Sequence, residues 1–266
     1  MDQTMDILQT LILAIIQGIT EWLPISSSGH LAIAQKYFNI KSTLTFDIAL
    51  HVGTIFVVLI TFRKDVVDIL KAFFKRDFGS EEGKLALFII VGSIPTAIIG
   101  FILLYYDVID VFFSNSLIVG VALLITGAFL YASGHVKDGK ELNHLDSMLI
   151  GIAQGVATIP GISRSGFTIS TGLLRKVKRE KVFKYSFLLS IPAVLGAMAA
   201  TIIKEHANLT IGSLDLGLTV LGVITSFVIG YIALQLLQKI FMKQKFHLFA
   251  YYCWIIGLLT IFLYFL

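Results

Sequence analysis

Six long apolar runs limit the folds that are open to this chain. A transmembrane helix needs about 20 mainly apolar residues. Only 14% of the 266 residues are charged, whereas soluble domains carry about 25%. We therefore expect an all-α integral membrane protein with one membrane domain, residues 1–266. The expected transmembrane helices cover residues 44–62, 85–105, 116–133, 185–203, 216–237 and 248–266.

Two further apolar regions, residues 7–37 and 147–174, are interrupted in the middle by Pro, Gly and Ser. Each half is too short to span a bilayer. Irregular backbone at membrane depth is tolerated only where protein or a water-filled cavity satisfies it. We expect each region to form a re-entrant helical hairpin, which enters the membrane and returns to the same side.

The distribution of basic residues favours this arrangement. If the six runs cross and both hairpins return, nearly all of the 21 Lys and Arg residues lie on one side. The other side receives only Lys36, Lys41 and Lys204, and Arg164 lies inside the second hairpin. Basic loops face the cytoplasm, so the basic side is predicted to be cytoplasmic. The net charge of +4 then reflects contact with anionic lipid, and we expect no nucleic-acid partner.

The two interrupted regions also repeat each other. Residues 17–30 read Q-G-I-T-E-W-L-P-I-S-S-S-G-H, and residues 154–167 read Q-G-V-A-T-I-P-G-I-S-R-S-G-F. Three crossings separate them, so the second half of the chain has the opposite orientation. This predicts an inverted-topology repeat of residues 1–134 and 135–266, a plan found in many transporters. The two hairpin tips should then meet near the middle of the membrane.

The polar residues at the tips predict a phosphate-binding site. Each S-x-S-G run follows a break and begins a new apolar segment, which places its serines at a helix N-terminus. Such termini bind anions, phosphate above all, and Arg164 adds a cation with bidentate geometry. The predicted phosphate-binding residues are Ser26, Ser28, Ser163, Arg164 and Ser165, and Ser27 adds a further hydroxyl.

Glu21 and His30 add the means for catalysis. Glu21 opposes anion binding unless it holds a cation or a proton. Gln17 lies one turn before it on the same helical face, and this oxygen pair suits a hard divalent cation, Mg²⁺ or Ca²⁺. His30 can transfer protons near neutral pH. Together these groups predict metal-assisted phosphoryl transfer on a lipid-borne phosphate.

The two motifs resemble the signature motifs of the undecaprenyl-diphosphate phosphatase family, the bacitracin-resistance type. The similarity extends over the whole chain, including F-D-I-A-L-H-V-G-T at residues 46–54 and S-F-L-L-S-I-P at residues 186–192. The resemblance implies hydrolysis of the C55 isoprenyl diphosphate to the monophosphate lipid carrier of cell-wall synthesis. It also implies a divalent-cation requirement, a bacterial plasma-membrane location and a site that opens to the outer face.

Matched to this sequence, the family motifs differ in two positions. Gln17 stands where some members have Glu, so a cation held by two carboxylates is not expected here, and Ser28 stands where others have Thr. The preferred roles are Ser27 as nucleophile and His30 as its base and later acid, with His30 itself as the alternative nucleophile. The matched residues are Gln17 and Glu21, then Ser26, Ser27 and His30, then Ser163, Arg164 and Ser165.

The sequence is also compatible with other functions. The inverted repeat also fits a transporter or flippase for a phosphorylated polyprenyl lipid, and a non-catalytic lipid-binding scaffold is a third alternative. Asp47 and His51 share a helical face, which fits interfacial solvation as well as a supporting role in the site. The lone Cys253 excludes an internal disulfide. Membrane lipid and the lipid substrate are the expected partners, and a homodimer is compatible with the sequence.

Overall fold

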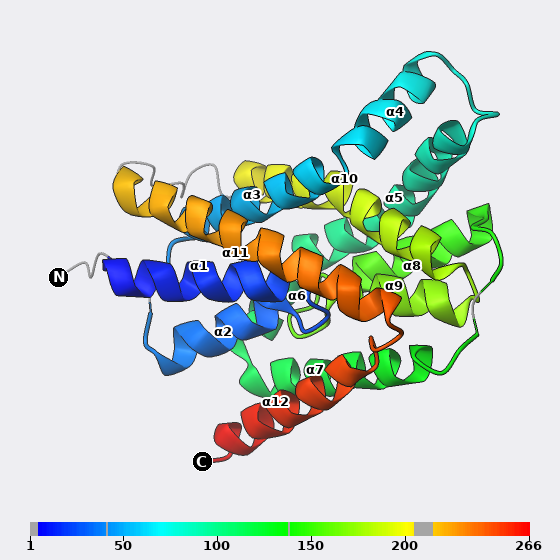
Figure 1. Ribbon diagram of the computed structural model, residues 1–266. Coiled ribbons are helices and arrows are strands. Elements are labelled where there is room, and N and C mark those ends of the chain that lie inside the picture. Colours follow the sequence, from blue (N-terminus) through cyan, green and yellow to red (C-terminus); the bar gives the residue numbers. More distant parts are fainter. Residues whose placement is uncertain (1–4, 41, 138, 205–214) are drawn as a thin grey trace.

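The computed structural model describes residues 5–40, 42–137, 139–204 and 215–266 (Figure 1). Their secondary structure is helical, apart from an isolated bridge between Lys140 and Val177. The helices are α1 (Ile7–Trp22), α2 (Ser27–Tyr37), α3 (Leu44–Thr61), α4 (Arg63–Phe74), α5 (Glu81–Tyr105), α6 (Val108–Ser114), α7 (Ser116–Ser133), α8 (His144–Val156), α9 (Arg164–Leu174), α10 (Arg179–Lys204), α11 (Leu216–Met242) and α12 (Leu248–Tyr264).

The helices have the length and composition of an integral membrane protein. Within the described residues, four helices are long and apolar enough to cross a membrane, namely α5, α7, α10 and α11. Helix α3 is equally apolar but bends by 78° into α4, and α12 is an apolar helix of 17 residues. The expected all-α fold is therefore confirmed, and these helices fit the expected integral membrane protein.

Several helix boundaries differ from the expected runs. Helices α5 and α10 begin at Glu81 and Arg179, before the predicted starts at residues 85 and 185. Their polar first turns extend the helices beyond the apolar segments, and the Ser80 hydroxyl caps α5 by accepting the Gly83 N–H at 3.2 Å. Helices α4 and α6 were not expected, because neither contains an apolar run of spanning length.

Ion pairs connect several helix ends and loops at one end of the molecule. The buried Asp146 at the start of α8 pairs with Lys140 at 2.7 Å and with Arg175 at 2.8 Å. Glu141 pairs with Lys178 at 2.5 Å. We call this end, on the right in Figure 1, the basic end. Two further ion pairs, Lys181–Glu81 and Lys184–Asp65, join α5 and α4 to it.

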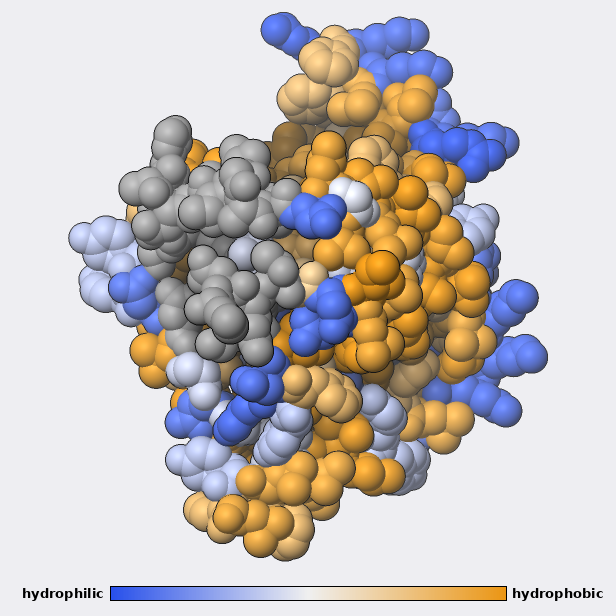
Figure 2. Space-filling view, turned by 90° about the vertical axis from the view of Figure 1, so that its left-hand side faces the viewer, coloured by the Kyte–Doolittle hydropathy of each residue, from blue (hydrophilic) through white to orange (hydrophobic). Residues whose placement is uncertain are grey.

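The flanks of the molecule are apolar and exposed. Side chains of Ile98, Phe101, Ile224 and Ile255 are between 56% and 65% exposed. Figure 2 shows the end opposite the basic end, where hydrophilic side chains form a column beside a broad apolar flank. A continuous exposed apolar surface of this extent indicates contact with lipid.

Close helix contacts connect the first and second halves of the chain. Helix α1 packs on α11, α8 packs on α5, and α7 packs on α12. A Cβ on Gly18 would lie 2.9 Å from the carbonyl oxygen of Ser226, and one on Gly151 would lie 2.1 Å from that of Gly92. Small residues therefore let these backbones approach closely, as at other helix contacts in membranes.

Candidate active site

The break between α1 and α2 forms the first hairpin tip. Pro24 disfavours helical backbone at Leu23, which is extended with ψ 146°. Ser26 then has φ 70°, and its hydroxyl accepts the Gly29 N–H at 3.3 Å, so that Ser27 begins α2. A non-glycine residue in this left-handed region is uncommon and often marks a functional site.

The break between α8 and α9 forms the second tip in a similar way. Gly161 has φ +93°, a conformation that L side chains rarely adopt. The Ser163 hydroxyl accepts the Gly166 N–H at 3.1 Å, and Arg164 begins α9. Each S-x-S-G run thus caps a helix at its first serine, as the sequence predicts.

The two tips contact each other. The Gly161 N–H donates to the Ser26 hydroxyl at 3.1 Å, although the two residues come from different halves of the chain. Thr126 of α7 supports the second tip, because its hydroxyl donates to the Gly161 carbonyl at 3.0 Å and accepts the Ser163 N–H at 3.1 Å. The breaks therefore form one junction rather than two separate turns.

Glu21 lies at the centre of this junction, where it is 7% exposed. Its Oε1 pairs with the guanidinium of Arg164. Its Oε2 accepts hydrogen bonds from the Ser27 hydroxyl at 2.6 Å and from the Gln17 amide at 3.0 Å. Ser27 and Arg164 occupy equivalent positions, as the first residues of α2 and α9, so the two halves supply a hydroxyl and a cation to one carboxylate.

His30 lies beside this cluster with both ring nitrogens engaged. Nδ1 is 2.8 Å from the Ser26 carbonyl oxygen, and Nε2 is 2.8 Å from the Tyr252 hydroxyl. A carbonyl can only accept, so Nδ1 carries a proton, and in the neutral ring Nε2 then accepts from the Tyr252 hydroxyl. The hydroxyl of Ser27 donates to Glu21 instead of to His30. In this arrangement Glu21, and not the expected His30, is placed to take the Ser27 proton.

Three residues outside the predicted set contact the site. His51 of α3 places Nε2 3.7 Å from Glu21 Oε2. The Trp22 ring lies 5.4 Å from the Arg164 guanidinium carbon, within range of a cation–π interaction. Tyr252 of α12 stacks on His30. Of these, only His51 had a sequence signal, namely its helical spacing from Asp47, which fitted interfacial solvation equally well.

The remaining predicted serines also lie at the tips. Ser28 Oγ is 3.4 Å from Ser26 Oγ, and Ser165 Oγ is 3.4 Å from Ser163 Oγ. Ser26 and Ser163 use their hydroxyls to cap helices, whereas these two neighbours make only long contacts. A narrow hollow beside Arg164 is lined by Ser165 and also by Trp22, Ser186, Phe187 and Ser190.

Three buried polar atoms of the site have no hydrogen-bond partner among the described residues. They are Gln17 Oε1, Arg164 Nη1 and the indole nitrogen of Trp22. Such atoms are rare in folded proteins and indicate a missing ligand or ion. Gln17 Oε1 and Glu21 are oxygen ligands of the kind that Mg²⁺ and Ca²⁺ prefer. The described residues contain no cluster of three His, Cys, Asp or Glu side chains with metal-ligand geometry, so a cation here would also need oxygens from a substrate.

The arrangement has the chemistry of a phosphoryl-transfer site. A hydroxyl donates to a buried carboxylate, a guanidinium has an unused N–H group, and an imidazole lies one turn along α2 on the face of Ser27. An attacking group, its base and a cation for developing negative charge are the parts that such a reaction needs.

Comparison with known proteins agrees with this chemistry. Residues 10–259 match the family described as bacitracin resistance protein BacA. An undecaprenyl-diphosphatase from Korarchaeum cryptofilum is 42% identical over 96% of this chain and 98% of its own length. A protein of the same name from Methanosphaera stadtmanae is 42% identical over 97% of this chain and 98% of its own length. Another from Carboxydothermus hydrogenoformans is 40% identical over 95% of this chain and 95% of its own length. The resemblance noted in the motifs is thus confirmed, and the chain belongs to the bacitracin resistance protein BacA family.

Proposed function

We propose that this chain hydrolyses undecaprenyl diphosphate to undecaprenyl phosphate and inorganic phosphate. The observation that carries the proposal is the buried Glu21, which binds Ser27 of one hairpin tip and Arg164 of the other. The chain's relatives are named for this phosphatase activity, which supports hydrolysis over the transporter alternative. Such an activity recycles the lipid carrier of peptidoglycan synthesis and gives resistance to bacitracin.

Ser27 is the proposed nucleophile. Its Oγ attacks the terminal phosphorus while its proton passes to Glu21 Oε2, 2.6 Å away. The bond between that phosphorus and the bridging oxygen breaks, and the prenyl monophosphate leaves. Water then attacks the phosphoserine, Ser27 recovers a proton and inorganic phosphate is released. His30, one turn along α2, is proposed to transfer the proton of that water.

Arg164 is the proposed clamp for the transferred phosphate. Its Nη1 is buried and has no hydrogen-bond partner in the described part of the chain, while Nη2 binds Glu21. The Trp22 ring beside it helps to fix the plane of the guanidinium. The hydroxyls of Ser28 and Ser165 lie at the two helix N-termini and would donate to the same phosphate oxygens.

A divalent cation, Mg²⁺ or Ca²⁺, is proposed to bind at Glu21 and the Gln17 carbonyl oxygen. The unpartnered Gln17 Oε1 supports this position. When bound, the ion would supply charge neutralisation for the diphosphate. Because Glu21 is the one carboxylate that the described residues place in the cluster, the substrate's own oxygens would complete the coordination.

The proposed membrane arrangement has six crossings, α3, α5, α7, α10, α11 and α12, and two re-entrant hairpins, α1–α2 and α8–α9. The hydrogen bond from the Gly161 N–H to the Ser26 hydroxyl joins the two hairpin tips, and this contact supports the arrangement. The basic end would face the cytoplasm, and the site would open toward the outer face of the bacterial inner membrane. Backbone contacts between Lys140 and Lys178 support one shared side for the loops that carry them.

The helix contacts support the inverted repeat of residues 1–134 and 135–266. Exchanging the halves converts the α1–α11 contact into α8–α5 and converts α3–α11 into α10–α5, and both partners of each exchange are present. Helices α7 and α12 contact each other in the same reciprocal way. A Cβ on Gly127 would lie 3.0 Å from the Ala250 carbonyl oxygen, and one on Gly257 would lie 2.8 Å from that of Gly120.

The test is phosphate release from undecaprenyl diphosphate by the purified full-length protein in detergent or vesicles. Wild type should release phosphate, and Ser27→Ala should not. A protein that folds but releases no phosphate under any divalent-cation condition would contradict the proposed function. Unchanged release by both Ser27→Ala and His30→Ala would refute the assignment of these residues.

A further inference from the structure

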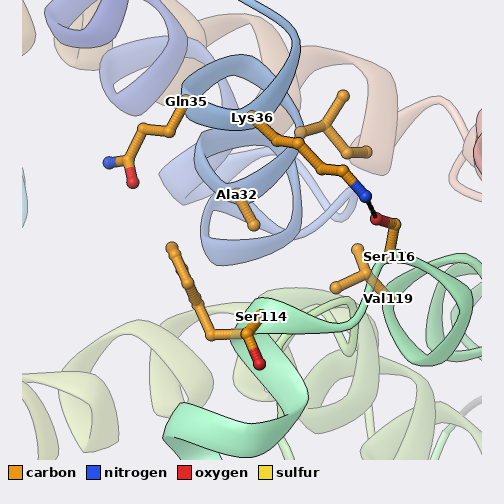
Figure 3. Close-up of a pocket in the computed structure, with 8 residues that line it drawn as sticks. Ala32, Gln35, Lys36, Ser114, Ser116 and Val119 are labelled. Carbon is orange, nitrogen blue, oxygen red and sulfur yellow. Dashed lines mark hydrogen bonds between the residues drawn. The ribbon is translucent and has the colours of Figure 1, made fainter. Parts of the chain in front are cut away.

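A cavity of about 380 Å³ lies outside the Glu21 cluster, between α2, α6 and α7 (Figure 3). Its polar lining consists of the Lys36 ammonium, the Ser114 and Ser116 hydroxyls and the Gln35 side chain, and its apolar lining includes Ala32 and Val119. The Lys36 Nζ donates to the Ser116 hydroxyl at 2.5 Å, as the dashed line in Figure 3 shows.

The Lys36 side chain is exposed, and no carboxylate of the described residues pairs with it. No acidic oxygen of the described residues lies within 4.0 Å of Nζ. The rings of Tyr37 and Tyr264 lie 5.9 and 6.0 Å away, which stabilises the ammonium but leaves its charge in place. Asp47 accepts from the Gln35 amide at 3.2 Å, and Figure 3 shows Gln35 pointing away from Lys36.

One face of α2 extends from the proposed catalytic site to this cavity. Ser28, Ala32 and Lys36 follow one another at four-residue spacing, so their side chains form a row on the helix. Lys36 thus lies about 12 Å along the helix axis from Ser28. On the other wall, the Val119 carbonyl closely approaches Gly161 of the second tip.

We propose that this cavity is a second phosphate subsite, which receives inorganic phosphate after hydrolysis and releases it at the end opposite the basic end. The proposal rests on the proposed function, because hydrolysis supplies the phosphate. Lys36 would provide the charge, and the Ser116 hydroxyl, which accepts from Lys36, would donate its own proton to a phosphate oxygen. The Ser114 hydroxyl donates to the Val111 carbonyl at 2.9 Å and adds no free donor. A phosphate group of a lipid headgroup has the same chemistry and could enter the same cavity.

The test is inhibition of hydrolysis by added inorganic phosphate in vesicles of phosphatidylcholine. In Lys36→Gln the phosphate inhibition constant should rise about 10- to 100-fold, as expected for loss of one hydrogen bond from a charged donor. Lys36→Arg should retain the wild-type inhibition constant. The matched control is Lys71→Gln, which removes one exposed charge from α4 at the basic end and should change nothing.

A second measurement distinguishes inorganic phosphate from a lipid phosphate as the ligand. It also distinguishes failure of the subsite from failure of the proposed function. If phosphatidylglycerol copurifies with wild type but not with Lys36→Gln, the subsite holds a lipid phosphate. Equal phosphate inhibition and equal lipid retention in both proteins would overturn the subsite. If wild type hydrolyses no polyprenyl diphosphate, the proposed function fails, and line broadening of inorganic phosphate in ³¹P NMR still decides whether Lys36 binds it.

Discussion

Glu21 joins the two halves of the chain at the level of single residues. A buried carboxylate is stable only when its oxygens are hydrogen-bonded or paired. One oxygen binds Arg164 from the second hairpin, and the other binds Ser27 and Gln17 from the first. The same contacts that stabilise Glu21 also place a hydroxyl beside a proton acceptor, so its structural role and its proposed catalytic role coincide.

Glu21→Gln should lower kcat by about 10²- to 10⁴-fold, because an amide cannot accept the Ser27 proton. The measurement is phosphate release at saturating lipid substrate. Glu141→Gln is the control, since that carboxylate is exposed at the basic end, where hydrogen bonds from Lys178 and then Lys181 lower its pKa to about 2. Retention of activity in Glu21→Gln would exclude Glu21 as the base.

Arg164→Lys should lower kcat by about 10²-fold while the protein still folds. Lysine keeps the charge, but it loses the planar fork that can bind Glu21 and a phosphate together. Arg63→Lys on the surface of α4 is the control. A lysine variant with wild-type kcat and KM would show that a simple positive charge is sufficient at this position.

The sequence predicts which residues form the site better than it predicts the hydrogen-bond partner of each residue. The motifs predict that Glu21, Ser27 and Arg164 meet, and the structure brings them into contact. The expected Ser27–His30 pair is not formed, because the direction of a side chain at the first turn of a helix depends on the cap. Ser26 with φ 70° sets that direction, and no pattern of residue types encodes it.

At the level of secondary-structure elements, the sequence predicts the positions of the two breaks better than it predicts the full set of helices. The sequence locates both breaks by their Pro, Gly and Ser residues, and α1 and α2 have the expected limits, residues 7 and 37. It does not predict α4, which is amphipathic and begins directly after the bend from α3. An apolar-run criterion detects spanning length only, so helices of this kind are missed.

Gly161→Ala should destabilise the second tip by about 1–3 kcal/mol, because an L residue is strained at φ +93°. Its Cβ would also lie 2.6 Å from the Val119 carbonyl oxygen. The measurement is the thermal midpoint in detergent, together with activity. Gly196→Ala in α10 is the control, since apart from the adjacent residues and backbone of α10 itself no atom of the described residues lies within 4 Å of its Cβ position. Its midpoint should stay constant or rise.

At the level of the whole molecule, the proposed topology makes a labelling prediction. Cysteines introduced at Lys71, Lys140 and Lys178 should react with impermeant reagents from one side of the membrane, and cysteines at Lys41 and Lys204 from the other. Position 41 lies outside the described residues. The native Cys253 is buried and should give little background. Labelling of positions 140 and 178 from opposite sides would contradict the second re-entrant hairpin.

Removal of divalent cations should abolish phosphate release and leave the helical content unchanged. The proposed ligands among the described residues are Glu21 and the Gln17 carbonyl, which would be too few for a tight site without substrate. Chelation followed by titration with Mg²⁺ or Ca²⁺ measures this dependence, with circular dichroism as the check on folding. Full activity in excess chelator would exclude the cation.

The pairing of α1 with α11 has a consequence for biosynthesis. Helix α1 begins at Ile7, whereas its partner begins at Leu216. At ribosomal speeds of about 5–20 residues per second, the first hairpin waits on the order of ten seconds or longer for the surface that covers it. During that interval Gln17 and Glu21 need temporary shielding from acyl chains, by the insertion machinery or by a chaperone within the membrane.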